Sequence, residues 1–414
     1  MKKQAIRFLC LLMTLVMFEG LWTTAFADLN KSGKCGDNLQ FYYNFNADSV
    51  RIWGTGPMYD ATDKFDSFLW KECFGPSFVN KIQIDRGVTH IGAFAFCDCG
   101  VSSITLPETV TSIGKSSFRN CDSLKQINIP ETVTSIGESA FNGCTMLNSV
   151  NIPKGVTKIE DWTFFECEFL AEIDLPSGLT SIGEFAFSDT QLTEILIPNG
   201  VTSIGDSAFS NCFYLKQVTI PGSVETIGDS AFKQCSALKS VTLQPGVREI
   251  GEWAFNDCKT LSSIKIPGSV ERIGEYAFYE CKNLTTVVIP EGVKYIGASA
   301  FAWAYNGTSG PEHIYILNRG EIDFGWDPFE TGTTIYCYRN TPAAQWAEKK
   351  AKFNDFTIVY LDGDADGNGK VNLQDFLRMM QYVAGWSVVI DDSADMDLNG
   401  TIDLEDVLLL LRSL

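Results

Sequence analysis

The stretch of sequence that decides the fold is LKQINIPETVTSIGESAFNGC, residues 124–144. Its apolar residues Ile127 and Ile129 alternate with polar ones, which favours a short strand. The proline that follows ends the strand because it has no N–H to donate. A second extended piece, residues 133–136, leads to a glycine, and we interpret residues 138–141 as one helical turn. A unit of this kind cannot bury its apolar side alone and needs neighbours.

The same pattern recurs ten times along the chain. A phenylalanine returns every 22 or 23 residues, and an isoleucine stands five residues before each one. The phenylalanines are Phe96, Phe118, Phe141, Phe164, Phe187, Phe209, Phe232, Phe255, Phe278 and Phe301, and the isoleucines are Ile91, Ile113, Ile136, Ile159, Ile182, Ile204, Ile227, Ile250, Ile273 and Ile296. Self-similarity at this period predicts a solenoid that buries Ile, Ala, Phe and Leu columns between neighbouring repeats.

Cysteine occupies one column of the repeat. Eight of the thirteen cysteines follow a repeat phenylalanine by three residues: Cys99, Cys121, Cys144, Cys167, Cys212, Cys235, Cys258 and Cys281. Thr190 and Ala304 take this place in the other two repeats, which predicts a small buried position. Stacked parallel side chains fit disulfide geometry poorly, so we expect thiols, and no histidine or CxxC pair favours a metal. A disulfide between Cys35 and Cys73 stays open.

Three further columns are expected at the surface. An acidic residue often follows the Ile-Gly pair, where we expect it to favour the N-terminus of a short helix: Glu138, Asp161, Glu184, Asp206, Asp229, Glu252 and Glu275. The next column mixes serine with Trp162, Phe185, Trp253 and Tyr276. These aromatic side chains could bind a sugar or a protein partner, or pack at an edge. The outward strand column is chemically mixed and names no ligand: Asn128, Asn151, Asp174, Leu196, Thr219, Thr242, Lys265 and Val288.

The N-terminus has the pattern of a secretory signal peptide. Lys2, Lys3 and Arg7 precede an apolar stretch over residues 8–18, and Ala25 and Ala27 frame a cleavage site. The apolar stretch is too short for a membrane span. We therefore expect residues 1–27 to be removed and the protein to be secreted and extracellular.

The C-terminus contains two copies of a calcium-loop pattern, 31 residues apart. Oxygen side chains stand at loop positions 1, 3, 5, 9 and 12, glycine stands at position 6, and position 7 offers a backbone carbonyl. The predicted ligands are Asp364, Asp366, Asn368, Lys370, Asn372 and Asp375 in the first loop, and Asp395, Asp397, Asn399, Thr401, Asp403 and Asp406 in the second. A pair of plain acidic turns is the alternative, but two copies in register argue against coincidence. The apolar residues that follow each loop predict two helices with a partner.

The repeats resemble the 23-residue leucine-rich repeats of the bacterial BspA-like family over residues 81–304. The resemblance implies an α+β leucine-rich repeat solenoid, with parallel β rungs and short helical turns. Residues 35–58 resemble the N-terminal β-hairpin cap of that family. We expect a last rung at 335–338, a capping helix at 341–352 and a closing strand at 356–360. The expected divisions are an N-terminal cap at 28–80, about ten repeats at 81–310 and a C-terminal cap at 311–361.

Residues 362–414 resemble a type I dockerin module. The resemblance implies a small all-α domain with two EF-hand-like loop-helix units, two Ca²⁺ ions and a cohesin module of a scaffoldin as partner. The cohesin-binding residues implied by position are Leu373, Gln374, Met380, Gln381, Leu404, Glu405, Leu411 and Arg412. Leucine at loop position 10 departs from the Ser/Thr of the family, which leaves open the identity of the cognate cohesin.

Composition and motifs limit the function. The 32 basic and 51 acidic residues give a net charge of −19, which argues against nucleic acid or an anionic membrane as the main partner. Two histidines, with no GxSxG or HExxH motif, predict no catalytic site. We therefore expect a non-catalytic component of a cellulosome-like complex, in the context of polysaccharide degradation, whose solenoid binds a protein or carbohydrate. The alternatives are a cellulosomal glycoside hydrolase or other polysaccharide-active enzyme, and an adhesin or protease inhibitor.

Overall fold

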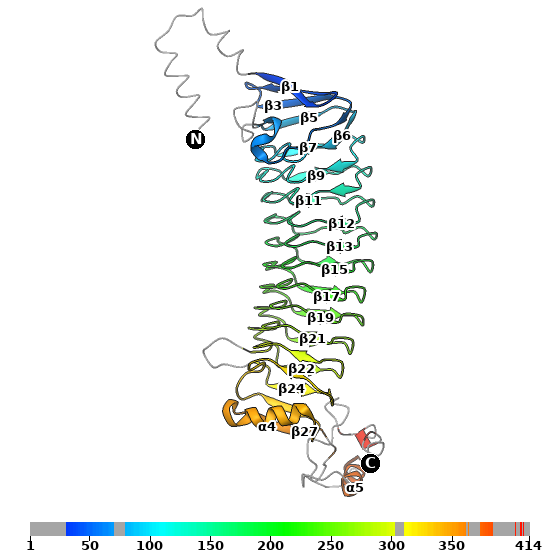
Figure 1. Cartoon of the computed structure of the whole chain (residues 1–414), viewed down its shortest axis with the longest axis vertical. Coiled ribbons are helices and arrows are strands. Elements are labelled where there is room, and N and C mark those ends of the chain that lie inside the picture. Colours follow the sequence, from blue (N-terminus) through cyan, green and yellow to red (C-terminus); the bar gives the residue numbers. More distant parts are fainter. Residues whose placement is uncertain are drawn as a thin grey trace, which may run out of the picture. The chain divides into compact units, whose positions relative to one another are not determined.

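The computed structural model describes residues 30–69, 79–302, 310–361, 363, 373–383, 402, 406, 407 and 409. The expected signal peptide, Cys73 and most of both predicted calcium loops lie outside these residues. The chain divides into two compact units, Met1–Leu215 and Lys216–Leu414. Within each unit, short strands of successive repeats stack beside one another (Figure 1).

The first unit opens with an antiparallel sheet. Strands β1 (Lys31–Gly36), β2 (Leu39–Asn44) and β3 (Ser49–Gly54) pair in sequence, and β3 then pairs in parallel with β5 (Lys81–Ile84). The alternating pattern of β2 buries Phe41 and Tyr43 completely. The short β4 (Gly56–Pro57) and the 3₁₀ helix η1 (Lys64–Asp66) follow, and the side chain of Asp63 caps η1. The antiparallel cap thus supplies the strand edge on which the first repeat pairs.

Most repeats of the first unit contribute two short strands, one to each of two parallel ladders. One ladder holds β7 (Ser103–Thr105), β9 (Gln126–Asn128) and β11 (Ser149–Val150), with β14 (Ile195–Leu196) further along the chain. The other holds β4, β6 (Val88–Ile91), β8 (Ser112–Ile113) and β10 (Ser135–Ile136), and then β12 (Lys158–Ile159), β13 (Ser181–Ile182) and β15 (Ser203–Ile204). The register places like residues opposite one another, Ile91 against Ile113 and Ile113 against Ile136.

The second unit has two parallel ladders of the same kind. One holds β16 (Gln217–Ile220), β18 (Ser240–Leu243) and β20 (Ser263–Lys265), then β22 (Thr286–Ile289), β24 (His313–Ile316), β26 (Thr334–Cys337) and β27 (Thr357–Tyr360). The other holds β17 (Thr226–Ile227), β19 (Glu249–Ile250), β21 (Arg272–Ile273), β23 (Tyr295–Ile296) and β25 (Asp323–Phe324). The predicted parallel β solenoid is therefore present in both units.

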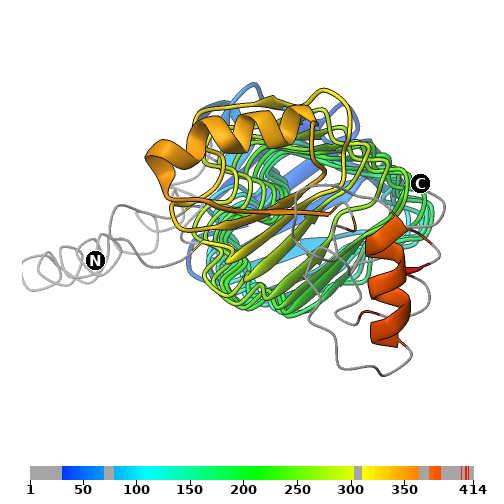
Figure 2. The ribbon, with the colours of Figure 1, turned by 90° about the horizontal axis from the view of Figure 1, so that it is seen from below.

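Two helices follow the ladders of the second unit. Helix α4 (Pro342–Asn354) begins after Thr341, whose side chain accepts a hydrogen bond from the amide of Ala344, and it has proline in its first turn. Figure 2 shows α4 and β27 crossing the last repeats of this unit. The helix buries Ala343, Ala344 and Ala347. Helix α5 (Leu373–Val383) lies in the segment predicted to follow the first calcium loop.

The core of each unit is a ladder of stacked phenylalanines. Ring centroids from Phe96 to Phe209 are 5.3–5.5 Å apart in the first unit, and those from Phe232 to Phe301 are 5.0–5.4 Å apart in the second. These rings are completely buried or nearly so, as are the alanines that precede them from Ala140 onward. The phenylalanine, alanine and isoleucine columns predicted from the repeat are confirmed.

The predicted helical turn at 138–141 is wrong, because the backbone there alternates between two hydrogen-bonding directions. Ser139 has a φ of 56°, in the left-handed region, and its amide donates to the carbonyl of Asp161 in the next repeat at 2.9 Å. The amide of Ala140 instead donates locally, to Gly137, and that of Phe141 again reaches the next repeat, at Thr163. In a helix every amide donates within its own segment, to the carbonyl four residues earlier. In the observed turn, alternate amides donate instead to carbonyls of the neighbouring repeat.

Candidate functional site

The aromatic column forms a ring cluster on the turns of the first unit. The Trp162 and Phe185 rings stack at a centroid distance of 4.1 Å and an angle of 19°. The Phe165 ring meets both of them edge-on, 4.9 Å from Trp162 and 6.0 Å from Phe185. All three side chains are partly exposed, so the cluster is part of the surface. We call these three residues the first aromatic cluster.

A second aromatic cluster has the same plan in the second unit. Trp253 stacks on Tyr276 at 4.2 Å and 16°, and the Tyr279 ring stands edge-on to both. The structure thus brings Trp162 together with Phe185 and Trp253 together with Tyr276, in two separate pairs. Sequence reasoning missed Phe165 and Tyr279, because their column also holds Cys97, Arg119 and serine in other repeats and shows no aromatic pattern.

The backbone of these aromatic residues is strained. Trp162, Phe185, Trp253 and Tyr276 have φ values of 51–60°, a region that bulky side chains seldom occupy. Serine takes the same conformation in five other repeats: Ser116, Ser139, Ser207, Ser230 and Ser299. The left-handed turn is therefore a property of the repeat, and the aromatic side chain is an addition to it. Residues in this conformation concentrate at functional sites, where their cost is about 1–3 kcal/mol each.

A pair of carboxylates accompanies each cluster, 91 residues apart along the chain. Glu166 and Asp189 follow Trp162 and Phe185 by four residues, and Asp257 and Glu280 follow Trp253 and Tyr276 by four. All four carboxylates belong to residues in the left-handed region, at the same position of the turn in four repeats. The side-chain amide of Asn211 donates to Oδ1 of Asp189 at 3.0 Å, and the hydroxyl of Ser188 donates to Oδ2 of Asp189 at 2.8 Å. The 91-residue recurrence is the sequence signal that could have identified these carboxylates.

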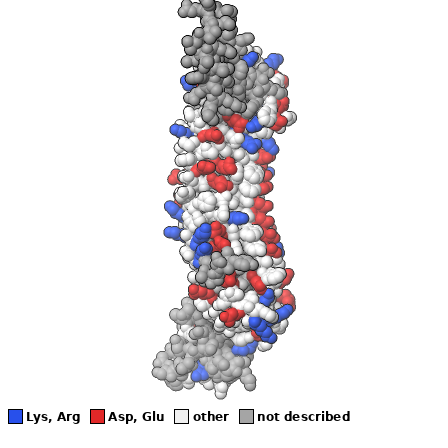
Figure 3. Space-filling model, turned by 90° about the vertical axis from the view of Figure 1, so that its left-hand side faces the viewer, with Lys and Arg blue, Asp and Glu red and all other residues white. Residues whose placement is uncertain are grey.

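The predicted acidic column has a different role from the one expected. Because the turns are not helical, residues such as Asp161 and Asp229 do not lie at the N-terminus of a helix. The Oδ1 atom of Asp161 instead accepts the amide of Glu184 at 2.8 Å, and that of Asp229 accepts the amide of Glu252 at 2.7 Å. Acidic side chains recur over the face that Figure 3 shows. Part of this column therefore links one repeat to the next through the backbone.

The cysteine column consists of buried thiols, as predicted. All eleven cysteines in the described part of the chain are reduced and buried. The Sγ atoms of Cys121, Cys144 and Cys167 lie 3.1–3.3 Å from a phenylalanine carbonyl oxygen of the preceding repeat, to which the thiol donates. Burial raises the pKa of the Cys212 thiol to about 12. Within the described residues no group of side chains could hold a metal ion.

The outward strand column includes residues with structural partners. The side chain of Asn151 both donates to the carbonyl and accepts from the amide of Ile129, each at 2.8 Å. Leu196, in contrast, is 82% exposed on β14. The column therefore supplies repeat-to-repeat bonds at one position and an isolated apolar side chain at another. It does not form a continuous ligand surface of one chemical kind in the first unit.

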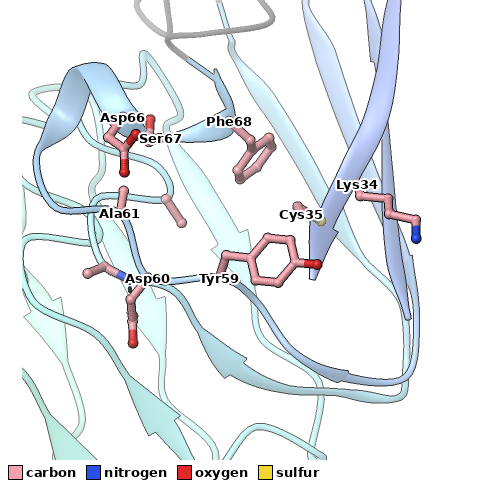
Figure 4. A pocket seen from close by; sticks show the side chains of 10 residues that line it. Lys34, Cys35, Tyr59, Asp60, Ala61, Asp66, Ser67 and Phe68 are labelled. Carbon is pink, nitrogen blue, oxygen red and sulfur yellow. Dashed lines mark hydrogen bonds between the residues drawn. The ribbon is translucent and has the colours of Figure 1, made fainter. Parts of the chain in front are cut away.

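A cavity of about 290 Å³ lies in the N-terminal cap of the first unit (Figure 4). Cys35, Tyr59, Ser67 and Phe68 line it. Burial raises the pKa of the Cys35 thiol to about 12, so this group is protonated at neutral pH and is a poor nucleophile. The hydroxyl of Tyr59 donates to Asp37 at 2.9 Å. These contacts hold the cap together and do not assemble a reactive centre.

One hydrogen-bonded chain beside this cavity has the residue types of a hydrolase triad. His90 Nε2 lies 3.0 Å from Asp60 Oδ1, and His90 Nδ1 lies 2.7 Å from the hydroxyl of Ser112. His90 and Ser112 are register partners on β6 and β8, so their contact follows from the ladder. The Asp60 side chain is 66% exposed, whereas the carboxylate of a catalytic triad is buried. The chain of contacts is therefore better explained by strand pairing.

The predicted calcium and cohesin-binding residues lie mostly outside the described part of the chain. Asp375 and Asp406, at position 12 of each loop, are described and are completely buried on helical backbone. Gln374 is exposed and Gln381 is partly exposed on α5. Leu373 and Met380 belong to the same helix. The remaining residues of both predicted sets fall outside the described residues.

The comparison with protein families identifies the repeats. Residues 89–216 and 202–308 match the BspA type leucine-rich repeat region, in six copies, which together span more than half of the chain. The chain therefore belongs to the BspA-type leucine-rich repeat family. No curated protein matches it significantly.

One solved structure supports the same fold, and a second is a weaker likeness. A leucine-rich repeat protein from Bacteroides ovatus is 24% identical, with a TM-score of 0.51, over 78% of this chain and 99% of that chain. A leucine-rich repeat protein from Eubacterium ventriosum is 22% identical, with a TM-score of 0.44, over 66% of this chain and 88% of that chain.

Among the described residues, no helix is long and apolar enough to cross a membrane.

Proposed function

We propose that this chain is a secreted, non-catalytic binding protein of a cellulosome-like complex that acts in polysaccharide degradation. Its leucine-rich repeats present a ligand surface, and its C-terminal residues form a dockerin that binds a cohesin on a scaffoldin. The observation that carries the ligand surface is the pair of aromatic clusters held partly exposed on left-handed turns. Exposed aromatic side chains on a rigid frame are typical anchors of binding sites.

The donor set at the C-terminus fits calcium. Side-chain and backbone oxygens at the loop positions are the hard ligands that Ca²⁺ prefers. The two described members of the set, Asp375 and Asp406, are completely buried carboxylates. Each stands at position 12 of its loop, where a carboxylate is a usual calcium ligand. The other predicted ligands, from Asp364 and Asp395 onward, would complete the two sites.

Cohesin binding tests the dockerin. We expect the full secreted chain to bind a cohesin from a panel of the source organism in the presence of Ca²⁺, and to lose this binding in EDTA. The double variant Asp364→Ala, Asp395→Ala should lose binding in the same way. The double variant Asp174→Ala, Asp323→Ala removes the same charge from the described repeats and should bind as the parent does. Binding that survives both EDTA and the loop variant would exclude this mechanism.

A hydrolase is the alternative that the carboxylates near the aromatic clusters keep open. Glycoside hydrolysis needs two carboxyl groups on either side of the scissile bond. Glu166 and Asp189 instead belong to a column of polar residues along the turns, and the family model that matches the chain is a leucine-rich repeat region. We therefore expect no release of reducing sugar from plant polysaccharides by the full chain. Activity that Glu166→Gln abolished would favour the enzyme over the binding protein.

A further inference from the structure

The two aromatic clusters differ in their cations. In the second unit, the Lys233 ammonium lies 4.9 Å from the centroid of the Trp253 ring, a cation–π contact. Lys259 forms an ion pair of 3.2 Å with Asp257, one of the two carboxylates of this cluster. The second cluster therefore has two cations for its two carboxylates, Asp257 and Glu280, all supplied by the chain itself.

The first cluster has neither of these lysines. Counting back 91 residues, Asn142 stands in the place of Lys233 and Glu168 stands in the place of Lys259. From residue 159 to residue 215 the sequence contains ten acidic residues and no Lys, Arg or His. The same arrangement of stacked rings and carboxylates is thus present without the two lysines of the second cluster.

The pKa of Glu166, four residues after Trp162, is raised. Partial burial, Asp189 and Glu168 together raise the pKa of Glu166, and the opposing influence of Arg119 is smaller. Like charges close together disfavour the ionised form, so Glu166 lies where a cation would be stabilised. A cation brought by another molecule would relieve the repulsion among these side chains.

We propose that the first aromatic cluster and the carboxylates Glu166 and Asp189 bind a lysine- or arginine-rich segment of a protein partner. One cationic side chain lies over Trp162 as Lys233 lies over Trp253, and neighbouring cations pair with the carboxylates. The proposal deepens the ligand-binding role proposed above and rests on it, since it names the class of ligand. A neutral polysaccharide could stack on the rings but would not neutralise the excess negative charge. Charge complementarity therefore favours the cationic peptide.

The probe is a short oligolysine peptide, with the fully Nε-acetylated peptide as its matched control. Binding to the full secreted chain is measured by isothermal titration at low and at physiological salt. We expect one site for oligolysine, weakened by salt, and no binding of the acetylated peptide. Equal binding of the two peptides would overturn the proposal, because it would show that the ammonium groups are not recognised.

Substitutions at corresponding positions locate the site. Trp162→Ser installs the residue that five other repeats carry in the same backbone conformation, so the turn is preserved, and we expect the affinity to fall about fivefold to tenfold. Trp253→Ser is the matched control and should leave the affinity within about twofold, since Lys233 already occupies that ring. If both variants bound alike, the site would not be the first cluster.

Exchanging the cations gives a test that does not depend on loss of binding alone. Asn142→Lys should occupy the Trp162 ring from within the chain and reduce the affinity for oligolysine. The double variant Lys233→Asn, Lys259→Glu should create a second site and raise the stoichiometry from one to two. An unchanged stoichiometry in this double variant would contradict the role given to the lysines.

The outcomes separate this inference from the wider function. If a cello-oligosaccharide bound and Trp162→Ser abolished its binding, the cluster would be a carbohydrate site, and the cationic ligand would be excluded. If oligolysine did not bind while a cello-oligosaccharide bound and Trp162→Ser left that binding unchanged, the ligand-binding function would stand and the cationic site would fail. Cohesin binding should be unchanged in every one of these variants, because none of them lies in the C-terminal loops.

Discussion

One position of the repeat accounts for eight of the thirteen cysteines. The thiols of Cys121, Cys144 and Cys258 donate to phenylalanine carbonyls of the preceding repeat at 3.1–3.3 Å. Where threonine replaces cysteine, Thr190 donates to the Phe187 carbonyl of its own repeat at 2.8 Å. The column therefore accommodates small side chains, and both cysteine and threonine donate to a backbone carbonyl there.

Burial should make these thiols unreactive in the folded protein. The thiolate is the reactive form, and burial raises the pKa of both the Cys97 and the Cys212 thiols to about 12. Of the thirteen cysteines, removal of residues 1–27 and the substitution Cys73→Ala leave eleven. We expect Ellman's reagent at pH 8 to detect none of them in the folded chain and all eleven after unfolding in guanidinium chloride.

Added cysteines provide the controls for the thiol measurement. Thr190→Cys places a twelfth thiol in the buried column, and it should stay silent until the chain unfolds. Ser135→Cys places a thiol on the exposed face of β10, and it should react at once. Rapid reaction of the column thiols in the folded chain would show that the repeats open far more readily than the packing implies.

At the scale of the element, the phenylalanine ladder carries the packing of each repeat. The Phe141 ring lies between Phe118 and Phe164, at centroid distances of 5.4 and 5.5 Å and nearly parallel to both. We expect Phe141→Ala to lower the free energy of unfolding by about 3–5 kcal/mol, because it removes a buried ring and leaves a cavity. Urea denaturation followed by circular dichroism measures the change.

An exposed phenylalanine two residues after a column cysteine gives the matched control. Phe169 is 48% exposed in the same unit, so Phe169→Ala should change the free energy of unfolding by less than about 0.5 kcal/mol. If the two alanine variants lost equal stability, the stacked column would not be the main source of repeat-to-repeat packing.

The elements also show how far the sequence predicts the structure. The spacing of Ile113, Phe118 and Cys121 repeats so regularly that the columns, the paired strands and the buried thiols all follow from it. The turn at 138–141 was predicted as helical because its local pattern fits a helix as well as a turn. The bond from the Ser139 amide to the next repeat decides between them, and such a bond is invisible in one repeat alone.

The site is predictable to a smaller extent. Trp162 and Phe185 stand out in the sequence because serine is the alternative in their column. Phe165 and Tyr279 do not, because they join the clusters from a column of mixed chemistry and from different members of each pair of repeats. Only the edge-on contacts across the stack reveal them. The role of Lys233 is likewise visible only from the distance between its ammonium group and the Trp253 ring.

At the scale of the whole molecule, the negative charge is unevenly distributed. Without residues 1–27, the expected signal peptide, the net charge is −21, from 29 basic and 50 acidic residues, and residues 362–414 account for −8 of it, with eleven acidic and three basic residues. Part of that C-terminal charge is the proposed calcium ligand set. The bound ions would neutralise it, and their removal would leave the carboxylates of each loop to repel one another.

Removal of calcium should therefore act on one part of the molecule. We expect hydrogen exchange to accelerate in α5 when EDTA is added, because the loop before it loses its ion, while the strands of the repeats keep their protection. The Asp364→Ala, Asp395→Ala variant should exchange rapidly in α5 with or without EDTA. Protection of α5 that did not depend on Ca²⁺ would contradict the proposed metal sites.

The left-handed turn of each repeat has a consequence for how such proteins diversify. Serine and tryptophan occupy the same backbone conformation at this position, as Ser139 and Trp162 do in consecutive repeats. One or two nucleotide changes in a codon can therefore add or erase an aromatic ring without disturbing the core beneath it. A lysine on a neighbouring repeat, as Lys233 is for Trp253, can then cover such a ring from within the chain. The strands and the buried columns can therefore stay the same while the exposed side chains on the turns change.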